Sequence, residues 1–154
     1  MAGAGGHSLR AATGADVPRL AEIARAAYEP WVEPIGGEPR PMTDDYGELV
    51  RTRDVVVAER GGEVIGLMLL YESEDGFAVD NLAVDPSHQD AGVGRTLLAH
   101  AEDAARAAGH DSICLFTHVA MASNLALYEQ IGYVEFDRRP PGEEFLVYMR
   151  KPLD

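Results

Sequence analysis

A glycine-containing segment between two apolar stretches constrains the fold more than any other part of the sequence. Residues 77–84 are apolar and typical of a strand, and residues 93–108 are typical of an amphipathic helix. Their connection contains Gly92 and Gly94, which let the backbone turn without a side chain in the way. The first amide N–H groups of a helix have no partner inside it, so this strand–turn–helix unit predicts a binding site for phosphate.

Two familiar glycine patterns do not fit this segment. A Walker A loop requires lysine after its last glycine, but Arg95 follows Gly94. A dinucleotide-binding loop requires a third glycine, where this chain has Leu97. The remaining pattern is Gln-x-x-Gly-x-Gly, formed by Gln89, Gly92 and Gly94. By itself this hexapeptide is equally compatible with a purely structural turn.

A second motif lies further along the chain. Asn124 and Tyr128 are four residues apart and share one face of a predicted helix, and Gly132 stands where a helix-ending glycine is expected. Taken singly, Asn124 is also explained as a helix cap and Tyr128 as an ordinary half-buried tyrosine. In this order after the glycine loop, the motif resembles the GNAT superfamily of acyl-CoA-dependent N-acetyltransferases. The resemblance extends over residues 10–151.

Composition limits the classes of protein and partner. The length of 154 residues predicts one domain, over residues 8–154, and a hydrophobic content of 46% is ordinary for a globular chain. The Gly/Ala-rich start predicts a flexible leader of residues 1–7. A net charge of −13 argues against nucleic-acid and membrane partners; it suits a cationic amine, although solubility alone also explains it. No stretch approaches the ~20 apolar residues of a membrane span. The single Cys114 excludes an intramolecular disulfide, and we expect a cytoplasmic location.

The hydrophobic patterns predict an α/β fold with a mixed, mostly antiparallel sheet and helices on both faces, as the resemblance also implies. Helices are expected at 13–27, 43–50, 93–108 and 124–131, and a proline-rich loop at 30–42. Strands are expected at 8–12, 54–60, 63–71, 77–84, 112–117, 133–138 and 145–151.

The resemblance implies a binding site for acetyl-CoA and no metal. The glycine loop would hold the pyrophosphate, the backbone of Leu82 and Val84 would bind the pantetheine arm like a missing strand, and Asn124 would bind the same arm from the other side. Asp90 departs from the family pattern and would repel the pyrophosphate, so weak or ordinary affinity is expected. The implied cofactor-binding residues are Leu82, Ala83, Val84, Gln89, Asp90, Ala91, Gly92, Val93, Gly94, Arg95, Thr96, Asn124, Leu127 and Tyr128.

The implied reaction is direct attack of a primary amine on the thioester in a ternary complex. Tyr128 is the candidate general acid at sulfur, because a phenol with a pKa of about 10 is protonated at neutral pH. Asp80 and His118 are candidate bases, and many relatives have no dedicated base. Asp80 is expected on the same strand face as Ala78, Leu82 and Val84.

The acceptor site is less defined by the sequence. Tyr28, Trp31, Met42 and Tyr46 are candidates for an apolar wall, although all four would serve equally well as packing for the loop. Acceptors consistent with the resemblance are a small amine, a protein N-terminus or a lysine, and homodimers are common in the superfamily. The alternative is a non-catalytic domain that binds or senses acyl-CoA; the presence of both Asn124 and Tyr128 favours the enzyme.

Overall fold

The computed structural model describes residues 7–154, apart from the side chains of Asp90 and Ala91. One seven-stranded sheet has the order β1-β2-β3-β4-β5-β7-β6, and β4 and β5 form its one parallel pair within the described chain. The strands are β1 (Ser8–Ala11), β2 (Asp54–Arg60), β3 (Glu63–Ser73), β4 (Gly76–Val84), β5 (Ser112–His118), β6 (Val134–Arg139) and β7 (Leu146–Pro152).

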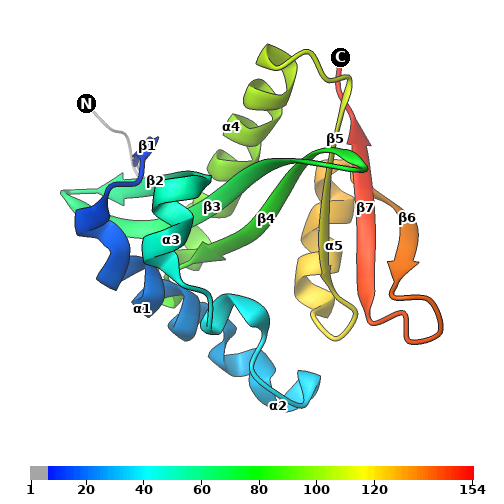
Figure 1. Cartoon of the computed structure of the whole chain (residues 1–154), viewed down its shortest axis with the longest axis horizontal. Helices are drawn as coiled ribbons and strands as arrows, with labels where there is room; N and C mark the ends of the chain where they lie inside the picture. The colour runs from blue at the N-terminus through cyan, green and yellow to red at the C-terminus, as the bar shows by residue number, and fades with distance from the viewer. Residues whose placement is uncertain (1–6) are drawn as a thin grey trace.

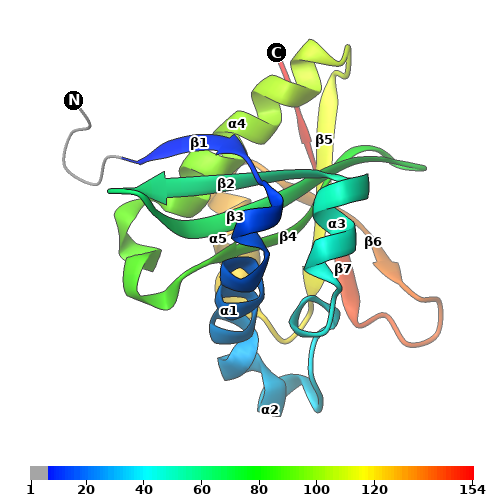
Figure 2. The same ribbon diagram turned by 60° about the vertical axis from the view of Figure 1, so that its left-hand side comes forward.

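Helices cover both faces of the sheet, as predicted (Figures 1 and 2). The α-helices are α1 (Val17–Tyr28), α2 (Val32–Ile35), α3 (Tyr46–Thr52), α4 (Val93–Ala107) and α5 (Ala122–Ile131). The 3₁₀ helices are η1 (Gly14–Asp16), η2 (Glu29–Trp31), η3 (Arg40–Met42) and η4 (Pro86–Ala91). The predicted loop at 30–42 therefore contains α2, η3 and most of η2. No helix in the described chain is long and apolar enough to cross a membrane.

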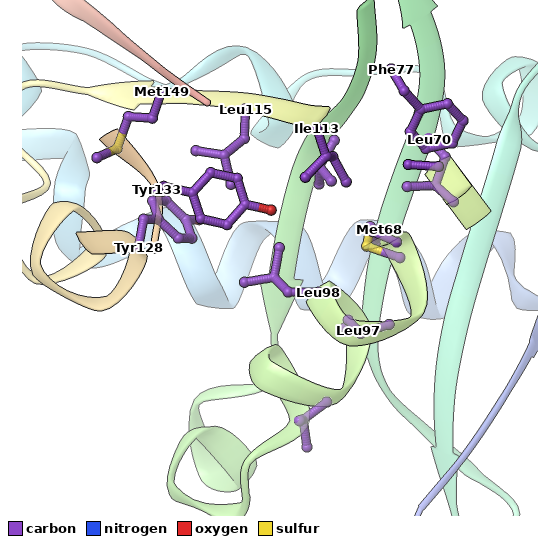
Figure 3. Close-up of a cluster of buried hydrophobic side chains, with 14 of the residues drawn as sticks. Met68, Leu70, Phe77, Leu97, Leu98, Ile113, Leu115, Tyr128, Tyr133 and Met149 are labelled. Carbon is purple, nitrogen blue, oxygen red and sulfur yellow. The ribbon is translucent and has the colours of Figure 1, made fainter. Parts of the chain in front are cut away.

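Two apolar clusters hold these layers together. Leu20 and Ile23 of α1 pack with Leu67 and Leu69 of β3 on one face. On the other face, the apolar stripe of α4 packs with side chains of β3, β5 and α5 (Figure 3). Helices α1 and α4 therefore each bury one amphipathic stripe against the sheet, which is the main stabilising contact that a helix of this length has.

A β-bulge interrupts β4 in front of the glycine loop. Opposite β3, Leu69 pairs with Asp80 and Leu67 pairs with Ala83, so Asn81 and Leu82 together face Met68. Asn81 takes the left-handed conformation with φ of 55°, which asparagine tolerates better than most residues.

The bulge changes which face each residue of β4 occupies. Directly opposite residues of an antiparallel pair point to the same side, so Asp80 lies with Ala83 on the α1 face. Leu82 and Val84 pack on the α4 face. The expected shared face of Asp80, Leu82 and Val84 is therefore wrong, because the extra residue reverses the alternation.

The parallel pair β4–β5 separates soon after it forms. Its pairing is confined to Ala78 with Cys114 and Val79 with Leu115, although β4 continues to Val84 and β5 to His118. Figure 1 shows the two strands diverging toward the ends where the glycine loop and α5 begin. The divergence leaves one edge of β4 without a neighbouring strand in the middle of the sheet.

Candidate active site

A slot of about 250 Å³ opens where β4 leaves β5. One side is the end of β4 and the other is the face of α5, with α1 and the glycine loop at its ends. The lining residues are Ala27, Tyr28, Trp31, Leu82, Ala83, Val84, Gln89, Gly94, Met121, Ser123, Asn124, Leu127 and Tyr128. Since backbone N–H and C=O groups need partners, a strand edge beside such a slot suits an extended amide-containing ligand.

The glycine loop lies at the mouth of this slot. Gly92 has φ of 77° and serves as the cap from which α4 starts at Val93. A Cβ placed on Gly94 would meet no atom within 4 Å, so space remains above the first turn of the helix. The side-chain amide of Gln89 donates to the carbonyl of Val84 at 3.3 Å and ties the loop to the strand.

The other residues predicted to contact the cofactor, in this loop and in the first turn of α4, make contacts within the protein or lie outside the described side chains. Val93 is fully buried in the core, and the Thr96 hydroxyl donates to the Gly92 carbonyl at 3.1 Å. Arg95 is exposed and donates to the side chain of Gln130 in α5 at 3.2 Å. The side chains of Asp90 and Ala91 lie outside the described part, and so does the expected repulsion by Asp90.

Helix α5 carries the second motif along the slot. Its cap is Met121, so Asn124 lies inside the first turn, which rules out its interpretation as the cap. Asn124, Leu127 and Tyr128 all line the slot, and Asn124 and Tyr128 lie one helical turn apart on the same face. Tyr128 is 6% exposed, and burial raises the pKa of its hydroxyl to about 12. Its ring meets Tyr133 edge-on at 6.0 Å (Figure 3).

A larger cleft of about 810 Å³ lies on the other side of the strand ends. Its lining residues are Tyr28, Ile35, Glu38, Pro39, Arg40, Pro41, Asp80, Asn81, Phe116, Thr117, His118, Met121, Phe145, Leu146 and Tyr148. Tyr28 and Met121 line both the slot and the cleft, so the two spaces meet at these side chains.

The four aromatic and apolar residues expected at the acceptor site are distributed differently. Tyr28 lines the cleft, whereas Trp31 lines the slot. Met42 and Tyr46 are 7% and 3% exposed and pack inside the molecule. Most of the aromatic wall comes from β5 and from the chain around β7, which sequence reasoning missed. Phe116 and Tyr148 are directly opposite in the β5–β7 ladder, a long-range pairing that no local pattern shows.

The two candidate bases both lie at the cleft. The Asp80 carboxylate accepts a hydrogen bond from the Arg40 guanidinium at 2.6 Å, and Arg40 also lies 3.4 Å from Asp44. His118 Nδ1 accepts from the Ala120 amide at 3.0 Å, and burial lowers the pKa of the ring. Neutral His118 therefore carries its proton on Nε2 and offers a donor.

A hydrogen-bond network links the bulge to the elements beneath it. The Asn81 amide donates to the Tyr46 hydroxyl at 2.8 Å, and Tyr46 donates to the Pro41 carbonyl at 2.5 Å. The Tyr28 hydroxyl donates to the Asn81 side-chain oxygen at 3.3 Å. Within residues 7–154, no cluster of three or more His, Cys, Asp or Glu side chains suited to a metal ion is found.

Comparisons with known proteins agree with this geometry. A family model described as Acetyltransferase (GNAT) family matches residues 17–133. An IAA acetyltransferase of Azospirillum brasilense is 36% identical over 104 residues, which cover 64% of this chain and 67% of that protein. The [Ribosomal protein bS18]-alanine N-acetyltransferase of Escherichia coli K12 is 27% identical over 145 residues, which cover 90% and 92%.

A similar fold occurs in a solved structure with a bound cofactor. The PaiA N-acetyltransferase from Thermoplasma acidophilum, in complex with coenzyme A, superimposes with a TM-score of 0.77 at 17% identity. The match covers 95% of this chain and 98% of that one.

Proposed function

Because the chain belongs to the GNAT acetyltransferase family, we propose that it transfers the acetyl group of acetyl-CoA directly to a primary amine held in the cleft. The acceptor is a small-molecule amine or the N-terminus or a lysine of a protein. One relative, the [Ribosomal protein bS18]-alanine N-acetyltransferase, is named for a protein acceptor, which supports this second possibility.

The meeting of slot and cleft at Tyr28 and Met121 is the observation that carries this proposal. The slot beside the free edge of β4 suits the pantetheine arm, and the loop at its mouth offers amide donors and a helix N-terminus to the pyrophosphate. A donor in the slot and an amine in the cleft would approach each other at this junction, as direct transfer requires.

Tyr128 is the proposed acid. It lines the donor slot, and its raised pKa of about 12 keeps it protonated across the physiological range. The amine nitrogen forms a bond to the thioester carbon, and collapse of the tetrahedral intermediate breaks the C–S bond. The departing sulfur then takes the Tyr128 proton, which solvent replaces.

Asp80 is the proposed base. A cationic amine must lose one proton before attack, and the Asp80 carboxylate is exposed to the cleft with one oxygen held by Arg40. Its second oxygen can accept a proton through a water molecule. His118 is the poorer candidate, because the ring nitrogen that would accept is already bonded to the Ala120 amide.

Thiol release from acetyl-CoA, measured with a panel of amines and peptides, tests the proposed activity. The Tyr128→Phe variant should lower kcat by ~100-fold, a typical loss for a general acid, with the Kd of CoA changed less than about threefold. Wild-type kcat should show no fall from Tyr128 ionisation below about pH 11, because the protonated form of a group with a raised pKa persists up to that pKa.

Tyr133→Phe is the matched control for this experiment. Tyr133 touches the Tyr128 ring but does not line the slot, and its buried hydroxyl has no hydrogen-bond partner in the described structure. Its kcat should stay within twofold of wild type. Equal activity of Tyr128→Phe and wild type would rule out the acid role. Binding of CoA with no thiol release for any acceptor would favour the non-catalytic sensing domain.

A further inference from the structure

Two stacked pairs of rings form part of the lining of the acceptor cleft. Phe116 of β5 and Tyr148 of β7 have ring centroids 5.0 Å apart with an interplanar angle of 23°. His118 and Phe145 stack at 5.7 Å and 26°. All four line the cleft, and Phe145 is 38% exposed. Flat apolar faces of this kind bind aromatic groups by stacking and bind cations through the ring quadrupole.

Among the described side chains that line the cleft, acidic groups outnumber basic ones by two to one. Arg40 is the only lysine or arginine among the described lining residues, and it is already shared between Asp80 and Asp44. Glu38 lines the rim and contacts Arg25 at 3.4 Å. Burial lowers the pKa of His118, which favours the neutral form of its ring. The net charge of −13 over the whole chain has the same sign.

The ring faces and the acidic side chains together should make the cleft prefer some acceptors over others, according to the chemical group next to the amine. An ammonium group entering the cleft approaches Asp80 and the ring faces, and both interactions attract it. A carboxylate beside that amine would face Asp80 and Glu38, while Arg40, the one basic side chain among the described lining residues, is already paired with Asp80 and Asp44. Like charges at short range discriminate strongly between otherwise similar ligands.

We infer that the acceptor is an aromatic primary amine with no carboxylate beside the amine, such as an arylalkylamine or the N-terminus of a peptide that begins with an aromatic residue. This inference rests on the proposed function and narrows its acceptor. The volume of about 810 Å³ suits a small molecule or the first residues of a peptide. In the reaction, the ammonium loses two protons in all, one before attack and one from the intermediate, and the products are the amide, the thiol and one proton.

Matched acceptors test the inference directly. Tryptamine, tryptophanamide and tryptophan share one ring system and differ in the group beside the amine, and butylamine has the amine without the ring. The kcat/KM of tryptamine and tryptophanamide should exceed that of tryptophan by at least ~10-fold, and tryptamine should exceed butylamine by a similar factor. Comparison of kcat/KM for tryptamine with that for the peptide Trp-Ala-Ala-amide shows whether the enzyme prefers a small-molecule amine or the N-terminus of a peptide.

Two variants link the preference to the cleft. Phe116→Leu should reduce the ratio of tryptamine to butylamine at least ~3-fold without changing the KM of acetyl-CoA. Phe136→Leu is the matched control, because Phe136 touches the same Tyr148 ring edge-on at 6.3 Å but does not line the cleft. In this control variant, the ratio of kcat/KM for tryptamine to that for butylamine should equal the wild-type ratio.

The outcomes separate this inference from the proposed function. Tryptophan used as well as tryptamine, or butylamine used as well as either, would overturn the inference while the enzyme activity stands. If no acceptor releases thiol, the activity proposal fails, and calorimetric binding of tryptamine and tryptophan in the presence of CoA still ranks the two ligands. Tighter binding of tryptophan would then overturn the inference as well.

Discussion

Gly92 and Gly94 lie two residues apart in one loop but serve different purposes. Gly92 has φ of 77°, a conformation that costs an alanine about 1–2 kcal/mol. Gly94 lies in the first turn of α4 with ordinary helical neighbours, and a methyl group there would project into open space at the donor slot. One glycine therefore shapes the backbone, and the other keeps room for a ligand.

Alanine substitutions separate these two purposes. Gly92→Ala should lower the free energy of unfolding by about 1–2 kcal/mol, measured by urea denaturation. Gly94→Ala should leave it unchanged or raise it by up to about 1 kcal/mol, because alanine is the better helix former. The same Gly94 variant should raise the Kd of CoA by ~10-fold or more in calorimetry, since its methyl group fills the ligand space. Unchanged affinity would contradict the placement of the phosphate at this turn.

At the scale of elements, β4 determines the geometry of the site. The bulge at Asn81 and Leu82 lets Asp80 face the acceptor cleft while the strand end borders the donor slot. The Asn81 side chain donates a hydrogen bond to Tyr46 of α3 and accepts one from Tyr28 of α1. Two helices distant in sequence therefore fix one irregular residue of β4.

Tyr46→Phe tests whether this network positions the site. The change leaves a buried amide hydrogen of Asn81 without its partner, which costs about 1–3 kcal/mol of stability. If the network also holds the strand end, the KM of acetyl-CoA should rise severalfold.

Ile113→Val is the stability control, because Ile113 is a fully buried core residue outside both spaces and the change costs about 1 kcal/mol. Its KM should match that of wild type. A Tyr46→Phe variant with unchanged KM would show that the network contributes only to stability.

Element positions followed well from the sequence where the signal is local. The apolar stripe of α4, and the apolar runs on either side of Gly61-Gly62 in β2 and β3, predicted these elements within two residues of their observed ends. The segment 30–42 was harder, because its prolines indicate breaks in regular structure but not the short turns of helix between them.

At the scale of the molecule, two carboxylates join distant parts of the chain. Asp16 accepts two hydrogen bonds from Arg10 of β1, at 2.8 and 3.0 Å, and Asp85 after β4 pairs with Arg19 of α1 at 2.5 Å. The Arg10 guanidinium lowers the pKa of Asp16 to about 2. At Asp85, burial acts in the opposite direction, but bonds from Ser87 and Arg19 outweigh it and lower the pKa to about 2.

Acid should therefore destabilise the protein in a defined window. A carboxyl group whose pKa is lower in the folded state stabilises it above the unfolded pKa, near 3.8, and loses this contribution as the pH falls through about 2. Between pH 4 and 2, each pair should cost about 1–2 kcal/mol of unfolding free energy. Urea denaturation at several pH values measures this.

In the Asp16→Asn variant, the loss of unfolding free energy between pH 4 and 2 should be smaller than in wild type by the contribution of the Arg10–Asp16 pair. Asp103→Asn is the control, because Asp103 is exposed and pairs with Arg106 on the same helix, a kind of contact that contributes little. An acid dependence identical in Asp16→Asn and wild type would contradict the assignment. The cytoplasmic location, the homodimer and the domain limits stay predictions from the sequence.

The sequence by itself determined the two motifs that we propose for the donor side of this protein. The strand, the glycine turn and α4 are consecutive, and Asn124 and Tyr128 lie one helical turn apart, so local patterns were enough to predict the turn and the shared helix face of Asn124 and Tyr128. Only the tertiary structure decided the acceptor side. The early end of the β4–β5 ladder, the Arg40–Asp80 pair and the stacking of Phe116 on Tyr148 all depend on contacts between residues more than thirty positions apart, and the bulge depends on pairing across the β3–β4 hairpin. Such contacts follow from the packing of whole elements, and no local pattern encodes them.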